Sequence, residues 1–464
     1  MKKELFKMIP KVDLVIEDER LIPIFENYDR KLIVKIIGDE LNLLRKDIAS
    51  GKVKSLDYDF VIKRVLKRIN IILSDFTTAM VNGTGIVLNT GLGRAPLSKS
   101  AVEKALSVME GYSTLEVDVK SGKRGRREDK IDSLVSLLTG VEAATVVNNN
   151  AAAVMICLNA LAEDKEVIIS RGEQVEIGGS FRMPDIIEKS GCIMKEVGAT
   201  NKTHPFDYEN NITENTGALV KVHTSNYKVK GFVEETSLEE ISDIAKRYKI
   251  YSYYDLGGGI IEDLGKYGLP HEPLVQESIR AGIDLVSFSG DKVLGGPQCG
   301  IIAGKRELVE KVKKNPYMRA FRLDKIRLAL LEETLKGYLK NSIREVNTTF
   351  NLLTMGVDEL ENRAKRLKEF LVDFLPDDWK VETEAIEDQA GSGTMPTQLL
   401  NGWAISIDQK KVSPNKLSEQ MRVKSSTPVF GFVRNEKYYL SVRTIFDKDY
   451  QIIEENLKAI IDDL

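Results

Sequence analysis

From about Asn82 onward, short apolar runs alternate with segments of helical periodicity, and this alternation constrains the fold more than any other feature. The runs occupy residues 145–147, 167–169, 218–223, 250–254, 283–288 and 300–303. Strands that alternate with helices predict a mostly parallel sheet covered on both faces. We therefore expect an α/β core, with its ligand site at the carboxyl ends of the strands.

Two flanking parts differ from this core. Residues 1–74 show helical periodicity with a break near 49–55, which predicts a helical N-terminal module. A helical stretch runs from about Lys325 to Phe374. The tail then has strand candidates at 400–407, 427–433 and 438–444 and a final helix at 450–464. The sequence thus predicts a helical module at 1–74, a catalytic core at 75–335 and a small α+β C-terminal domain at 336–464.

Composition excludes several classes of protein. Hydrophobic residues make up 42% and charged residues 30%, as in globular proteins, and no apolar run approaches the roughly 20 residues of a membrane helix. Cys157, Cys192 and Cys299 lack disulfide or metal spacing, and three histidines leave little room for a metal site. The expectation is a cytoplasmic protein with no metal and no membrane association. Net charge is −3, yet residues 1–74 hold 16 Lys/Arg against 12 Asp/Glu.

One lysine and one acid end two of the expected strands. Residues 287–298 read Ser-Phe-Ser-Gly-Asp-Lys-Val-Leu-Gly-Gly-Pro-Gln and place Lys292 in a turn of small residues directly after a strand. Asp255 ends another strand 37 residues earlier, about one helical crossover away. An enzyme that uses pyridoxal 5′-phosphate (PLP) needs a lysine for the Schiff base and an acid for the pyridinium nitrogen. Desolvation lowers the pKa of a lysine and makes it nucleophilic. Taken alone, Lys292 also fits a surface lysine in a glycine turn.

The cofactor phosphate has a candidate site at a helix start. Residues 144–153 read Ala-Thr-Val-Val-Asn-Asn-Asn-Ala-Ala-Ala, a strand that turns into a helix. A helix N-terminus with small residues suits an anion, so Asn149, Asn150 and Ala151 are candidate ligands. Ser289 adds a hydroxyl from the Lys292 loop. An ordinary helix N-cap is the alternative for this segment.

Two more strand ends are expected to face the same crevice. Residues 220–227 supply His223 and Asn226, with His223 near the ring hydroxyl or the substrate. Residues 171–182 supply Gln174 for packing on the ring face. A structural histidine is the alternative for His223, and the loop acids Glu173 and Glu176 have no assigned role.

Three arginines are candidates for binding an anionic substrate. They are Arg94, Arg319 and Arg322, since a guanidinium fork suits a phosphate. A basic loop at 120–127, Lys-Ser-Gly-Lys-Arg-Gly-Arg-Arg, fits either an RNA backbone or a solvated run of charge. Solvent exposure is likewise the alternative for each arginine.

Together these segments resemble one family, the bacterial selenocysteine synthases or L-seryl-tRNA(Sec) selenium transferases. The resemblance spans nearly the whole chain, which has the family's length and its helical N-terminal module before a fold-type I PLP core. It rests on residues 82–94 (Asn-Gly-Thr-Gly-Ile-Val-Leu-Asn-Thr-Gly-Leu-Gly-Arg), 171–180, 196–203, 223–227 and the Lys292 loop.

The resemblance implies conversion of L-seryl-tRNA(Sec) to L-selenocysteinyl-tRNA(Sec) by PLP-dependent β-elimination of water and addition of selenium from selenophosphate. It implies a homo-oligomer, a ring of dimers and commonly a decamer, with two chains at each active site and tRNA bound by the N-terminal module. Lys292 matches the Schiff-base lysine and Asp291 a neighbouring acid implicated in catalysis. Arg94, Arg319 and Arg322 match arginines of the selenophosphate or phosphate site.

Some positions depart from the family pattern, and rival functions remain. Phe432 stands where an arginine is expected, and the turn at 391–396 is an imperfect match. Since an ester-linked serine has no free carboxylate, Arg443 need not clamp one. The main rival is a PLP-dependent lyase or ammonia-lyase acting on a small amino acid or amino sugar acid, which has no use for residues 1–74. A PLP-binding RNA-interaction protein without turnover is the other alternative.

Overall fold

The computed structural model describes residues 2–75, 77–179, 181–391 and 394–464. Ser180 of the 171–180 motif, and Ser392 and Gly393 of the 391–396 turn, lie outside these ranges. Contacts divide the chain into two units, Met1–Ala79 and Met80–Leu464. Among the helices in the described ranges, none combines the length and apolar character that crossing a membrane requires.

The first unit is helical, as the periodicity predicts. Its helices are α1 (Lys2–Met8), α2 (Val12–Ile16), α3 (Ile22–Asn27), α4 (Arg30–Ala49) and α5 (Tyr58–Leu73). The side chain of Asp57 caps α5 by accepting a hydrogen bond from the Phe60 N–H. Ile37 and Leu41 of α4 pack with Val65 of α5 in one apolar core. The two long helices therefore stabilise each other across the break predicted at 49–55.

The second unit contains a seven-stranded sheet in the order β2-β10-β9-β8-β7-β3-β6. Its strands are β2 (Ala143–Val147), β3 (Glu166–Ser170), β6 (Ile193–Val197), β7 (Thr216–Val222), β8 (Tyr251–Gly257), β9 (Leu285–Ser289) and β10 (Gly300–Gly304). Only β10 is antiparallel to its neighbours; the remaining pairs are parallel. The expected mostly parallel sheet is confirmed, with β6 as an edge strand that the apolar runs did not reveal.

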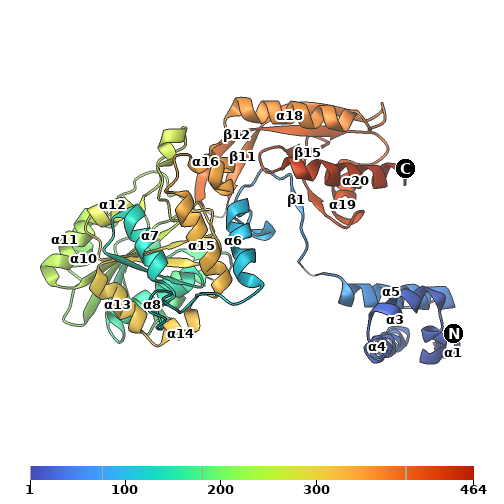
Figure 1. Cartoon of the computed structure of the whole chain (residues 1–464), viewed down its shortest axis with the longest axis horizontal. Coiled ribbons are helices and arrows are strands. Elements are labelled where there is room, and N and C mark those ends of the chain that lie inside the picture. Colours follow the sequence, from blue (N-terminus) through green and yellow to red (C-terminus); the bar gives the residue numbers. More distant parts are fainter. Residues whose placement is uncertain (1, 76, 180, 392–393) are drawn as a thin grey trace. The chain divides into compact units, whose positions relative to one another are not determined.

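Helices cover both faces of this sheet (Figure 1). They are α7 (Asp129–Thr139), α8 (Asn150–Ala162), α9 (Met183–Lys189), α10 (Pro205–Glu209), α11 (Leu238–Tyr248), α12 (Val275–Arg280), α13 (Arg306–Lys314), α14 (Tyr317–Phe321) and α15 (Lys325–Gly337). A further helix, α6 (Lys99–Met109), packs on α15. Consecutive residues of β7 enter different cores: Leu219 packs with α7 and α11, and Val220 packs with α8 and α9. A strand buried on both faces explains the continuous apolar runs of the sequence. A short hairpin, β4 (Glu176–Ile177) and β5 (Phe181–Arg182), lies outside the sheet.

The C-terminal part is an antiparallel sheet in the order β11-β12-β15-β14. Its elements are β11 (Lys380–Gly391), β12 (Thr394–Asp408), β14 (Phe432–Arg434), β15 (Lys437–Ser441), α18 (Val357–Val372), α19 (Pro414–Val423) and α20 (Tyr450–Ile461). Another strand, β1 (Val81–Asn82), pairs with β13 (Val429–Phe430). Residues 81–82, expected in the core at 75–335, thus pair with C-terminal strands. The boundaries at 74/75 and 335/336 otherwise stay predictions.

The helical stretch expected from Lys325 to Phe374 is broken in three places. After α15 come α16 (Ile343–Val346), α17 (Thr348–Thr354) and then α18. Asn347 separates α16 from α17, and its side chain caps α17 by accepting from the Phe350 N–H at 3.0 Å. The same side chain donates to the Leu294 carbonyl at 2.9 Å. The side chain of Asn347 therefore connects the start of α17 to the loop that carries Lys292.

Candidate active site

The loop that carries Lys292 is closed by its own backbone. The Gly290 N–H donates to the Cys299 carbonyl at 2.9 Å, and the Gly296 N–H donates to the Gly290 carbonyl at 2.9 Å. A Cβ at Gly290 would lie 2.4 Å from the Cys299 sulfur. Residues 283–297 are all buried. The small residues thus allow a tight, buried turn at the end of β9.

The amine of Lys292 is buried in this turn. Burial lowers its pKa; the carboxylates of Asp255 and Asp291 oppose that shift, and the nearby Arg94 guanidinium adds to it. A lysine with a lowered pKa has more of its amine in the neutral, nucleophilic form. The surface-lysine alternative for Lys292 is therefore wrong.

Asp255 is buried near the end of β8, within electrostatic reach of Lys292. Its Oδ1 accepts from Asn150 Nδ2 at 2.8 Å and from the Gly257 N–H at 3.1 Å. Burial raises the pKa of Asp255, against these two hydrogen bonds and the charges of Lys292 and His223. Both bonds reach Oδ1, so Oδ2 remains as an acceptor for a cationic N–H. The Oδ1 of Asn150 is also buried and has no hydrogen-bond partner in the described part of the chain.

The start of α8 lies against β10. Asn149 caps α8 by accepting from the Ala152 N–H at 2.9 Å, so the N-cap expectation holds whatever else the segment binds. A Cβ at Gly300 would lie 2.4 Å from the Asn149 carbonyl oxygen. Gly300 also pairs with Ser289 across β10 and β9. Asn149 and Ser289 thus both lie beside Gly300, and the role of Asn149, Asn150, Ala151 and Ser289 as phosphate ligands stays a prediction.

The structure places His223 beside Asp255 but gives Gln174 and Asn226 other partners. The backbone N–H of His223 donates to the backbone carbonyl of Asp255 at 2.9 Å, and the imidazole Nε2 of His223 lies 3.4 Å from Glu272 Oε2. Asn226 Nδ2 donates to the Glu176 carbonyl at 2.9 Å. Gln174 Nε2 donates to Glu196 Oε2 at 2.8 Å in an exposed position. The contacts of all three with a cofactor stay predictions.

A cavity of about 520 Å³ adjoins His223. Ser225 and Tyr227 from the segment after β7 line it, as do Lys202 and His271. Tyr227 also fixes the loop after β3, because its hydroxyl donates to the Gly172 carbonyl. The cavity has the size of a small-ligand site with polar walls.

The predicted arginines occupy two places. Arg94 Nη1 lies 2.9 Å from Asp291 Oδ2, beside Lys292, and Arg94 has a left-handed backbone with φ of 62°. Arg319 and Arg322 instead line a groove of about 440 Å³. Arg94 does not line that groove. Their expected joint role in binding one anion stays a prediction.

Glu173 is a residue that the sequence left without a role. It is buried, and its carboxylate accepts from Lys221 Nζ and from the Val222 N–H, both at 2.8 Å. Burial raises the pKa of Glu173 and Lys221 opposes that shift. The pair fastens the loop after β3 to β7, directly before His223. A lysine inside the apolar run 218–223 was the signal that a buried acid had to accompany it.

Arg443 is fully engaged within the C-terminal part. Its Nε lies 2.8 Å from Asp388 Oδ2, and its Nη1 and Nη2 donate to the carbonyls of Leu352 and Asn401 at 2.7 and 2.5 Å. The guanidinium is buried and holds the C-terminal sheet to α17. Phe432, the departure from the family pattern, stacks on Tyr439 with 5.2 Å between ring centroids.

Comparison with known proteins places this geometry in context. The family model "L-seryl-tRNA selenium transferase" matches residues 80–446. The L-seryl-tRNA(Sec) selenium transferase of Clostridium botulinum (strain Loch Maree / Type A3) is 42% identical over 463 residues, covering 99% of each chain. That of Alkaliphilus oremlandii (strain OhILAs) is 42% identical over 468 residues, again covering 99% of each. The solved structure of D-glucosaminate-6-phosphate ammonia-lyase has a TM-score of 0.59 at 17% identity, covering 85% of this chain and 98% of its own. It confirms the expected fold-type I architecture.

Proposed function

The chain belongs to the L-seryl-tRNA selenium transferase family, and from that premise we propose that it converts L-seryl-tRNA(Sec) to L-selenocysteinyl-tRNA(Sec). PLP is the proposed cofactor and selenophosphate the proposed selenium donor. The observation that carries the proposal is the buried amine of Lys292 within reach of the buried carboxylate of Asp255. The lyase and the RNA-binding alternatives share that pair, and the full-length match to the family favours the transferase.

The residues at this site suit PLP. Lys292 offers a buried amine with a lowered pKa to the aldehyde, and Asp255 Oδ2 offers an acceptor to the ring N–H. The backbone N–H groups at the start of α8, together with the hydroxyl of Ser289, suit the phosphate. PLP, when bound, supplies an electron sink for the charge that develops at the substrate Cα.

The remaining chemistry falls to side chains around Lys292. The lowered pKa of Lys292 suits its amine for taking the Cα proton of the seryl group. Asp255 holds a proton on the ring nitrogen because an anionic acceptor there stabilises the cation. Asp291, next to Lys292, is our candidate for relaying to the departing β-hydroxyl the proton that Lys292 takes from Cα; in the protein alone its carboxylate pairs with Arg94. Loss of that hydroxyl as water leaves Cβ open to selenium.

We assign the anionic donor to Arg94, Arg319 and Arg322. Arginine forks match the oxygens of a phosphate group, and two of these side chains line one groove. In the protein alone Arg94 is held by Asp291, so a bound anion must compete with that carboxylate. The assignment is supported by charge and by the match of these positions to the family.

The substrate enters as an aminoacyl ester. Arg443, the arginine considered for a free carboxylate, is buried and already bonded to Asp388 and two carbonyls. We propose that residues 1–74 bind the tRNA, in keeping with their excess of basic residues. We also propose a homo-oligomeric ring of dimers and, because all three cysteines are free, a reducing cytoplasmic setting.

One assay tests the proposal against its rivals. Seryl-tRNA(Sec) that carries labelled serine is incubated with the enzyme, with and without selenophosphate. The amino acid is then released from the tRNA and identified. We expect selenocysteine only when the donor is present, and none from Lys292→Ala. Turnover of free serine or an amino sugar acid, without selenium transfer to the tRNA, would favour the lyase. A protein that binds the tRNA and turns over nothing would favour the RNA-binding alternative.

A further inference from the structure

The groove that contains Arg319 and Arg322 has a second wall made by the basic loop at 120–127. The groove is about 440 Å³ in volume. Seven cationic side chains and three carboxylates line it: Arg124, Arg126, Arg127, Lys313, Lys314, Arg319 and Arg322, with Glu116, Glu128 and Glu310. Two features that looked unrelated in the sequence thus form one positively charged surface.

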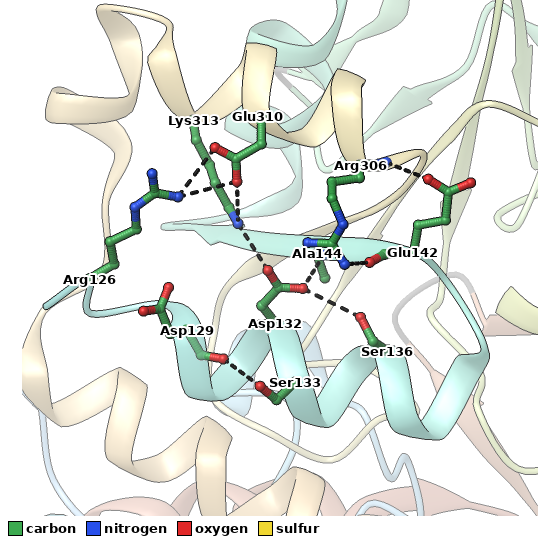
Figure 2. Close-up of polar contacts among 10 residues, drawn as sticks. All are labelled: Arg126, Asp129, Asp132, Ser133, Ser136, Glu142, Ala144, Arg306, Glu310 and Lys313. Atoms are coloured by element: carbon green, nitrogen blue, oxygen red, sulfur yellow. Dashed lines mark hydrogen bonds and ion pairs between the residues drawn. The ribbon is translucent and has the colours of Figure 1, made fainter. Parts of the chain in front are cut away.

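The base of this groove is fixed by ion pairs (Figure 2). Lys313 Nζ lies 3.1 Å from Asp132 Oδ2 and 3.3 Å from Glu310 Oε1. Asp132 on α7 also accepts from the Ala144 N–H at 2.8 Å, which connects α13 to β2. Glu310 in turn lies 3.2 Å from Arg126 Nη1. The loop is therefore held against α13, and Lys313 is already neutralised.

The cations at the rim are open to an incoming anion. The side chain of Arg124 is 76% exposed and that of Arg126 is 63% exposed, and they pair with Glu116 and Glu310 respectively. Arg319 is exposed and forms no ion pair with any residue that the structure describes. Exposed ion pairs contribute little and exchange readily for another anion. The rim offers cations on both walls, more than one small phosphate can contact.

The groove adjoins the candidate active site through a short piece of backbone. Val147 at the end of β2 forms an isolated bridge with Arg322, and the Asn148 N–H donates to the Phe321 carbonyl at 2.7 Å. Two residues further on, Asn150 donates to Asp255. The groove wall and the carboxylate of Asp255 are thus connected by residues 147–150.

We propose that this groove binds the phosphodiester backbone of the single-stranded 3′ end of the RNA substrate. The inference rests on the proposed function: serine is esterified to that 3′ end, so the last phosphates must approach Lys292 when the seryl group does. A groove with cations on both walls suits a chain of phosphates spaced along a strand. Arg124 and Arg126 contact the strand from one wall, and Lys314 and Arg319 face it from the other.

The test compares two double variants and the unsubstituted protein on two RNAs. The double variant Arg124→Gln/Arg126→Gln is measured against tRNA(Sec) and against the same tRNA without its unpaired 3′ nucleotides. A matched control, Arg247→Gln/Lys365→Gln, removes the same charge from exposed side chains (59% and 56%) that each pair with one carboxylate outside the groove. Dissociation constants are measured across a salt series with the full-length PLP-bound protein, and thermal unfolding confirms that each variant is folded.

We expect the double variant to bind intact tRNA(Sec) about 5- to 10-fold more weakly, with a salt slope smaller by roughly 1.4, as for two lost single-strand contacts. Binding of the truncated tRNA and both affinities of the control should change by less than about 2-fold. An equal loss with both RNAs would overturn the assignment to the 3′ end. Unchanged RNA binding with a raised KM for selenophosphate would assign the groove to the donor alone. Absence of selenium transfer by the unsubstituted enzyme would refute the proposed function separately, because these binding measurements need no turnover.

Discussion

Asn150 Nδ2 donates a 2.8 Å hydrogen bond to Asp255 Oδ1, and this contact joins the first residue of α8 to the end of β8. The carboxylate is buried, and burial raises its pKa. The amide of Asn150 is one of two hydrogen-bond donors that favour the charged form. The proposed role of Asp255 in stabilising a cationic ring therefore depends on the same helix N-terminus that we propose for the cofactor phosphate.

Substituting Asn150 with alanine should weaken this arrangement. A hydrogen bond to a charged group contributes about 1.5–3 kcal/mol, so we expect PLP affinity or kcat to fall roughly 10- to 100-fold. Cofactor titration by absorbance and steady-state kinetics measure the two effects. Asn211→Ala, which removes an amide that donates to the Asp207 carbonyl of α10, is the control and should leave both unchanged. Equal behaviour of the two variants would show that Asn150 does not support Asp255.

The stability of the PLP-free protein should depend on pH through Asp255. Its folded-state pKa is raised by burial, so above the usual carboxyl range the folded state binds more protons than the unfolded state. Stability must then fall as pH rises from the unfolded pKa toward the raised folded pKa. Asp255→Asn removes this pH dependence. The variant should therefore become more stable relative to the unsubstituted protein as the pH rises through that interval. Urea unfolding of the PLP-free forms at several pH values measures it, and a constant difference would contradict the expectation.

Asp255→Asn should also separate stability from function. The variant keeps the shape of the side chain but cannot hold a charge against the ring nitrogen. We expect the PLP-free variant to be at least as stable as the unsubstituted PLP-free protein at neutral pH. Selenium transfer should fall by at least about 100-fold, because the variant cannot keep the ring nitrogen protonated. Full activity in Asp255→Asn would show that the ring nitrogen is held by another group.

Asn347 should connect cofactor binding to the stability of the C-terminal part. Asn347→Leu loses both the cap of α17 and the bond to the Leu294 carbonyl. We expect the free energy of unfolding to fall by about 2–4 kcal/mol and PLP affinity to fall with it. Asn351→Leu, at a half-buried position of α17 where the side chain accepts from Arg344 Nη2, is the comparison. A stability loss without any change in PLP affinity would show that the Lys292 loop holds its shape unaided.

The buried pair of Arg443 and Asp388 should behave as a structural element. Arg443→Gln leaves a buried carboxylate without its cation, which costs about 3–5 kcal/mol. If the protein remains folded, its KM for seryl-tRNA(Sec) should be unchanged, because the guanidinium already bonds to three groups of the chain. A large rise in KM with little loss of stability would instead mean that Arg443 contacts the substrate.

Local patterns in the sequence predicted six of the seven strands of the central sheet, and the loop of Lys292, because strands buried on both faces are uniformly apolar. They missed β11, whose residues alternate between buried and exposed, and β6, an edge strand with charged residues. The break between α16 and α17 falls at Asn347, whose side chain bonds to a loop more than 50 residues earlier in the chain. No local periodicity contains that contact. Glu173 and the groove at Arg319 likewise arise only when distant segments meet.

The measurement that tests the central claim most directly is the visible absorbance of the purified protein, followed by reduction with borohydride and peptide mapping. The claim is that the amine of Lys292 carries PLP while Asp255 faces its ring. We expect a yellow protein in which reduction fixes the cofactor to the peptide containing Lys292, and a Lys292→Ala variant with no fixed cofactor. Cofactor fixed to another lysine, or a colourless protein in the presence of excess PLP, would contradict the account.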